Sequence, residues 1–157
     1  MFLNVSENTG KGAEKMAYSA LEIAKYVINH EHTEKREITN LRLQKLLYFV
    51  QAKLLVETGD PCFDDKMEAW AYGPVVPVVY DEYKKYGNLP ILEKQTLSEN
   101  LDEKTENYIN EILNYFAETP TFGLVQITHN QTPWIEAKRK GLHSTIEIES
   151  IKKYFAA

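Results

Sequence analysis

The residues of this sequence that could perform acid–base or nucleophilic chemistry are few and scattered. They are His129, the single cysteine Cys62, and the acidic pairs Asp64-Asp65 and Asp81-Glu82. A hydrolytic site needs a nucleophile, a base and a group that orients the base, and no local signature frames these residues in that way. We interpret the acidic pairs as solvated surface. We interpret His129 as a hydrogen-bonding residue that fixes the turn before Trp134, with a small enzyme built on His129 as a minor alternative.

The sequence also lacks the usual patterns for metals and phosphates. Its seven glycines are dispersed among turns, so no glycine-rich phosphate loop is present. His30 and His32 are too close in sequence to share one helical metal-binding face, and we expect them in a solvated loop. A single cysteine excludes an internal disulfide and a cysteine-rich zinc site. We therefore predict no metal and no cofactor.

Size and charge narrow the class of protein further. The chain has 157 residues, of which 43% are hydrophobic and 26% charged, as in an ordinary globular domain. Its net charge is -5, which argues against a DNA-binding surface. The one basic run, Lys138-Arg139-Lys140, precedes Gly141 and suits the carbonyl end of a helix. No apolar run is long enough to span a membrane and no signal peptide is evident, so we expect a cytoplasmic protein.

The element that must organise this domain is a helix over about residues 40–57. Thr39 can cap its start, and Gly59-Asp60-Pro61 ends it. At 3.6 residues per turn, apolar residues fall on two opposite faces of this helix. One face holds Leu43, Leu46, Leu47, Val50 and Leu54, and the other holds Leu41, Tyr48, Ala52 and Leu55. A helix with two apolar faces lies between layers, so we predict that it is central and buried.

The remaining pattern predicts a mainly α, single compact multi-helix domain. Residues 1–16 resemble a flexible leader, with the native start at Met1 or at Met16, and residues 17–157 form the helical domain. A capping box at Ser19-Ala-Leu-Glu22 starts the first helix. Further helices are expected over residues 76–86, 98–117, 121–128, 132–140 and 147–155, and one short β-hairpin around residues 62–72 and 89–95.

The stretch Ala69-Trp-Ala-Tyr-Gly-Pro-Val-Val-Pro-Val-Val-Tyr80 concentrates aromatic and turn residues. We expect Trp70 and Gly73 to act through folding, because glycine before proline indicates a backbone that other residues reach poorly. In the helix that follows, the tyrosines at 80, 83 and 86 cannot all share one core stripe. Some of this surface should face outward and contact a partner protein; the alternative is that all of it packs on the central helix. The predicted contact residues are Tyr72, Pro74, Val75, Tyr83 and Tyr86.

A helix-turn-helix over residues 19–57 would give a DNA-binding regulator instead. A recognition helix must keep one face free for the major groove. The second helix here uses both faces for apolar contacts, so we keep this hypothesis as the alternative only.

Two sequence blocks, in this order and about this far apart, resemble the Panacea family, also called SocA-like or GepA-like, of bacterial and prophage proteins. The first is Ile38-Thr-Asn-Leu41 with Leu43-Gln-Lys-Leu-Leu-Tyr48, and the second is Ala69-Trp70 with Tyr72-Gly-Pro-Val75. The resemblance covers about residues 17–155. The family-motif positions, which we expect to be structural, are Thr39, Asn40, Leu43, Gln44, Lys45, Leu46, Tyr48, Trp70, Gly73, Pro74, Tyr80, His129 and Trp134.

The resemblance implies an antitoxin that neutralises a cognate toxin protein by direct binding. One branch of the family acts as a proteolytic adaptor, so a cellular protease is a second implied partner. The family has no established catalytic residues, and the resemblance therefore implies a non-enzymatic protein. The toxin, the binding face and the oligomeric state do not follow from the residues.

Overall fold

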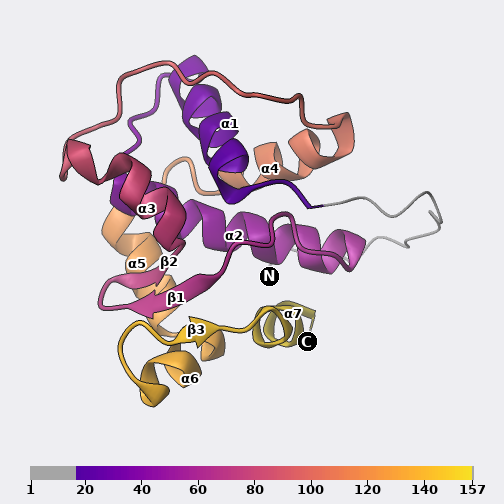
Figure 1. Ribbon diagram of the computed structural model, residues 1–157, viewed down its shortest axis with the longest axis vertical. Coiled ribbons are helices and arrows are strands. Elements are labelled where there is room, and N and C mark those ends of the chain that lie inside the picture. The colour runs from indigo at the N-terminus through magenta and orange to yellow at the C-terminus, as the bar shows by residue number, and fades with distance from the viewer. Residues whose placement is uncertain (1–16, 157) are drawn as a thin grey trace.

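The computed structural model describes residues 17–156 as seven α-helices, a 3-10 turn and a small sheet (Figure 1). The helices are α1 Ala20–Thr33, α2 Asn40–Thr58, α3 Pro77–Tyr83, α4 Glu103–Tyr115, α5 Thr121–His129, α6 Thr132–Lys140 and α7 Ile148–Ala156. The 3-10 turn η1 is Lys84–Tyr86, and the strands are β1 Met67–Trp70, β2 Gly73–Val75 and β3 Thr145–Ile146. The mainly α fold is confirmed. The leader predicted for residues 1–16, and with it the choice of start, lies outside the described residues.

Helix α2 is the centre of the fold, as its two apolar faces predict. It packs against α1, α3, α4, α5, α7 and β2 and runs through the middle of the view in Figure 1. Thr39 caps its start by accepting a hydrogen bond from the Arg42 amide at 3.2 Å, and Gly59 ends it at φ 83°. Every residue of α2 except Leu41 and Thr58 is buried. A helix this buried needs partners for its polar side chains as well as for its apolar ones.

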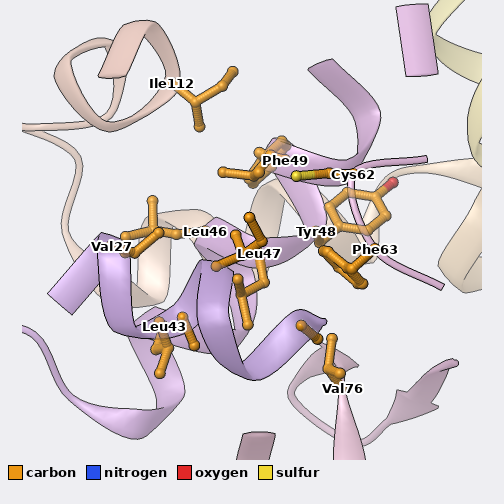
Figure 2. Packing of buried hydrophobic residues seen from close by; sticks show 14 of the residues in the cluster. Val27, Leu43, Leu46, Leu47, Tyr48, Phe49, Cys62, Phe63, Val76 and Ile112 are labelled. Atoms are coloured by element: carbon orange, nitrogen blue, oxygen red, sulfur yellow. The ribbon is translucent and has the colours of Figure 1, made fainter. Parts of the chain in front are cut away.

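The apolar core forms around both faces of α2. Figure 2 shows Leu46 and Leu47 between Val27 of α1 on one side and Phe63 on the other. All of these side chains are fully buried. Tyr48 and Phe49 meet edge to face at 5.1 Å between ring centroids, so aromatic packing continues the core toward α7.

The sheet differs from the predicted hairpin in its second strand. Its order is β2-β1-β3, and both pairs are antiparallel. Strand β1 lies in the predicted region, but it pairs with residues 73–75 and with 145–146, while residues 89–95 form no strand. Pro90 has no amide hydrogen to offer a sheet. The Ile91 amide instead donates to the Ile38 carbonyl at 2.8 Å, and the Leu89 amide donates to the Tyr86 carbonyl at 3.0 Å.

Three local predictions near the helix termini are corrected. Ser19 caps α1, but the Glu22 carboxylate accepts from the Ser98 and Glu99 amides and so ties down the loop before α4. Helix α4, predicted to begin at residue 98, begins at Glu103 with Asp102 as its cap, because residues 98–101 belong to the preceding loop. His30 and His32 lie in the last turn of α1 and not in a solvated loop, and the His32 ring Nε2 is 2.7 Å from the Ile91 carbonyl oxygen.

Candidate functional site

The turn that joins β1 to β2, and the segment after it, are fixed to α2 by buried polar side chains. The Lys45 ammonium nitrogen donates to the Pro74 carbonyl at 2.7 Å. The Gln44 side-chain oxygen accepts from the Val76 amide at 2.8 Å. Asn40 donates to the Tyr80 carbonyl at 3.2 Å, and its own amide oxygen accepts from Gln44. Three family-motif residues of α2, Asn40, Gln44 and Lys45, therefore bind backbone atoms of the aromatic stretch.

Gly73 is required at this turn for two reasons. Its φ of +108° is one that other residues rarely adopt. A Cβ atom here would also lie 2.7 Å from Thr128 Oγ1 and 2.9 Å from Lys45 Cε. Such close approach leaves no room for a side chain between the turn, α2 and α5.

Lys45 is a buried lysine whose charge is not neutralised by a carboxylate among the described residues. Desolvation lowers its pKa from 10.5 to about 7. One carbonyl contact does not compensate for burying an ammonium group. Lys45 therefore supports the turn as a hydrogen-bond donor that is only partly protonated near neutral pH.

The aromatic and imidazole side chains behind the turn complete the framework. The His129 ring stacks on Trp134 at 4.2 Å between centroids, and Trp134 Nε1 donates to the Trp70 carbonyl at 2.9 Å. Desolvation lowers the pKa of His129, while a hydrogen bond to the Ala71 backbone opposes this shift. His129 Nε2 is buried without a hydrogen-bond partner in the described part of the chain. The His129 ring thus contacts both the β1–β2 turn, through the Ala71 backbone, and Trp134 of α6.

A groove of about 350 Å³ opens in front of this framework. Its lining includes the Trp70 ring, which meets Tyr80 edge to face at 4.8 Å and stacks on His143 at 4.5 Å. Trp70 Nε1 donates to the Glu68 carboxylate at 2.9 Å, so the polar atom of the indole is satisfied. The groove therefore presents mainly apolar and aromatic surface to its occupant.

Exposed apolar side chains stand at and beside the groove. Tyr72 and Leu142 line it and are 60% and 55% exposed. Phe122 of α5 is 64% exposed, and its ring meets that of Tyr72 edge-on at 6.5 Å. We call Tyr72, Phe122 and Leu142 the rim. Exposed aromatic side chains next to an apolar groove are typical of protein-binding surfaces.

The structure separates the residues predicted to contact a partner. Tyr72 lies on the surface, and Val75 reaches the groove but is otherwise buried. Pro74 is buried under the turn, and Tyr83 is 2% exposed, with its hydroxyl donating to Gln95 at 2.8 Å. Tyr86 is half-buried and stacks on Tyr83 at 6.4 Å. For Pro74 and Tyr83 the expectation of an outward-facing side chain is therefore corrected. Pro74 lies in β2, whose three residues are all buried, and α3 turns its second tyrosine toward the core.

Sequence reasoning missed Phe122, Leu142 and His143. A signal existed for Phe122, because it follows Pro120 and lies off the face that buries Leu124 and Val125. No sequence signal pointed to Leu142 and His143 in the loop after α6, because this loop comes near Trp70 only through the pairing of β1 with β3.

The residues considered for catalysis are used structurally or lie apart. Cys62 is buried, and the Asp65 carboxylate accepts from the Ala20 amide at 2.7 Å at the start of α1. Within residues 17–156, no group of three or more His, Cys, Asp or Glu side chains could hold a metal ion. Nor is any described helix both long and apolar enough to cross a membrane.

The fold and the site together define the class of protein. It is a small helical domain in which an aromatic-rich turn is hydrogen-bonded to a buried central helix. A sequence model of the SocA-like antitoxin family, Panacea domain, matches residues 43–135, and the chain belongs to this family. The resemblance noted in the motifs is thus confirmed, over a shorter span than residues 17–155. The matched span includes the motif residues from Leu43 to Trp134, while Thr39 and Asn40 precede it.

A curated relative shows the same relationship. Over 57 residues the chain is 46% identical to Antitoxin SocA of Caulobacter vibrioides (strain NA1000 / CB15N). This stretch covers 36% of the present chain and 30% of the relative, so less than a third of the relative's length is matched. No solved structure matches the chain.

Proposed function

We propose that this protein is a cytoplasmic antitoxin that neutralises a cognate toxin protein by binding it directly, without catalysis of its own. Membership of the SocA-like antitoxin family is the observation that carries the proposal. The exposed aromatic rim beside an apolar groove supports it, because Tyr and Trp side chains are frequent anchors of protein interfaces. The groove and its rim are the contact region that we propose.

The framework behind the groove supports binding by a preformed surface. Lys45 and Asn40 donate hydrogen bonds to the Pro74 and Tyr80 carbonyls, and Gln44 accepts one from the Val76 amide; together these bonds hold the β1–β2 turn and the segment after it. A surface that is rigid before binding loses less conformational entropy on association. The family-motif residues thus serve the site by supporting it from beneath.

In this family the toxin is expected to be encoded beside the antitoxin, so the growth of cells that co-express this chain with a neighbouring toxin-like gene tests the proposal. We expect wild type to restore growth and Tyr72→Ala to restore it poorly. The matched control is Tyr115→Ala on α4, because Tyr115 is 59% exposed, close to the 60% of Tyr72. Failure of the wild type to rescue any neighbouring toxin would contradict the proposed function.

Neutralisation could proceed by blocking the toxin or by delivering it to a cellular protease as an adaptor. The amount of toxin in rescued cells separates the two routes. Blocking leaves the toxin level unchanged or raised, while delivery lowers it in a protease-dependent manner.

The DNA-binding alternative gains no support from the fold. A recognition helix must expose one face, and all residues of α2 except Leu41 and Thr58 are buried. Nor does His129 gain support as a catalytic residue, since its ring is stacked on Trp134.

A further inference from the structure

The groove shows a charge distribution that the whole chain does not. Acidic residues outnumber Lys and Arg by 23 to 18 in the sequence. Among the residues that line the groove, however, none is acidic, and the one with a permanent charge is Lys84. Lys84 contacts Asp81 at 3.5 Å, and both side chains are more than 60% exposed. Such an exposed pair is weak and is easily exchanged for another partner.

More positive charge lies in the chain just before Leu142 and His143, which line the groove. The last turn of α6 carries Lys138, Arg139 and Lys140, all exposed, immediately before the loop that brings Leu142 to the rim. Glu68, the acidic residue nearest Trp70, is already bound by the Trp70 indole and by Lys66 at 3.0 Å. The groove lining is thus mainly apolar and includes Lys84, and the basic turn of α6 comes just before its Leu142. The nearby carboxylates of Asp81 and Glu68 are each paired with a lysine.

We infer that the groove binds a short protein segment in which a large apolar side chain stands next to one or more carboxylates. This inference rests on the proposed function and gives the chemistry of the partner's contact segment. The apolar side chain would pack against the Trp70 and Tyr80 rings between Tyr72 and Leu142. Its flanking carboxylate would meet Lys84 or the basic turn that ends α6. A volume of about 350 Å³ lies at the small end for binding pockets, which suits a few side chains rather than a whole helix.

A single-stranded nucleic acid could also use aromatic rings and lysines, but the geometry favours protein. Base stacking needs an open ring face. One face of the Trp70 ring is covered by His143, and the edge of the neighbouring Tyr80 ring packs on it as well. The net charge of -5 also opposes a polyphosphate backbone.

Selection from a displayed library of random peptides on the full-length chain tests this inference without the toxin. We expect the selected peptides to share an aromatic residue or leucine next to Asp or Glu. Their affinity, measured by fluorescence anisotropy, should fall about tenfold or more in Lys84→Glu and in Tyr72→Ala. The matched control Lys104→Glu reverses the charge of an exposed lysine on α4 and should leave affinity unchanged.

Several outcomes would overturn the inference. These are selected peptides without acidic flanks, affinity unaffected by Lys84→Glu, and displacement of the peptides by a single-stranded oligonucleotide. A chain that sediments as a dimer until Tyr72→Ala makes it monomeric would show a second copy as the occupant. Failure of this inference can be told apart from failure of the proposed function. If the chain rescues growth but selects no peptides with acidic flanks, only the proposed groove chemistry is rejected. If it selects such peptides but does not rescue growth, only the antitoxin role is rejected.

Discussion

At the scale of one residue, the family-motif position Lys45 holds the turn in place, but burying its ammonium group costs free energy of folding. Its ammonium is fully buried and donates to the Pro74 carbonyl, and desolvation lowers its pKa to about 7. In the unfolded chain its pKa returns to about 10.5. Between these two values the unfolded state binds more protons than the folded state, so stability rises with pH across this window. Below the window Lys45 is protonated in both states, and its contribution to stability no longer changes with pH.

We therefore expect wild type to gain stability relative to Lys45→Met as pH rises from about 7 to about 9, approaching about 1.4 kcal/mol per pH unit. Urea denaturation of both proteins across this range measures the difference. Tyr48 and Tyr83 have raised pKa values, which would reduce stability only in more alkaline solution and in both proteins alike. A difference that does not change with pH would show that Lys45 keeps its ordinary pKa.

Gly73 gives a second prediction for a single residue. Gly73→Ala introduces a Cβ 2.7 Å from Thr128 Oγ1, while Gly59→Ala, also at positive φ, meets nothing within 4 Å. We expect Gly59→Ala to cost about 1–2 kcal/mol from backbone strain and Gly73→Ala about 1–3 kcal/mol more from steric overlap. Thermal unfolding of the two variants compares them. Equal losses of stability in the two variants would mean that α2, α5 and the turn can move apart to accommodate the added Cβ at residue 73.

At the scale of elements, α2 acts through its polar side chains as much as through its apolar faces. The Gln51 side-chain oxygen accepts from the Cys62 amide at 2.8 Å, and its nitrogen donates to the Phe63 carbonyl at 2.8 Å. About two turns earlier, the Gln44 side-chain oxygen likewise accepts from the Val76 amide, while its nitrogen donates to Asn40. Side chains of α2 thus hydrogen-bond to backbone groups of the irregular segments that precede β1 and follow β2.

Gln51→Met should therefore destabilise the fold by at least about 2 kcal/mol, because it leaves buried backbone groups at residues 62 and 63 without partners. Hydrogen exchange should also accelerate at the Cys62 and Phe63 amides. The control Gln126→Met changes an exposed glutamine on α5 and should stay within about 0.5 kcal/mol of wild type. Unchanged exchange at both amides in Gln51→Met would remove this role from α2.

The elements that were predicted well are those whose signals are local. The two apolar faces of α2, and the cap and glycine at its ends, lie within about twenty residues and define the helix by themselves. The pairing of β1 with β3 joins residues nearly eighty positions apart, and no local pattern encodes it. The strand expected near residues 89–95 was wrong because its apolar residues hold a loop: Ile91 is buried, whereas Leu92 is 80% exposed.

The same distinction explains the site at the scale of the whole molecule. Tyr72 could be predicted because the Tyr-Gly-Pro turn lies in one motif. Phe122 and Leu142 come from α5 and from the loop after α6, and only the tertiary fold places them beside Tyr72. The burial of Tyr83 likewise depends on how α3 packs on α1 and α2.

The whole molecule thus combines a turn held by side chains of α2 with an exposed aromatic rim. A substitution in the rim can therefore test binding without removing the hydrogen bonds that hold the turn. Tyr72 is 60% exposed and donates no hydrogen bond within the described structure, so Tyr72→Ala should leave stability within about 0.5 kcal/mol of wild type. Any loss of partner binding in this variant can then be assigned to the surface and not to unfolding.

Calorimetric titration of the purified chain with the toxin-like protein encoded beside it tests the central claim most directly. The account predicts saturable binding by wild type and by Tyr115→Ala, and binding weakened about tenfold or more by Tyr72→Ala in a protein that remains folded. No measurable binding by the wild type would contradict the antitoxin proposal. Equal affinity of wild type and Tyr72→Ala would contradict the placement of the interface at the aromatic rim.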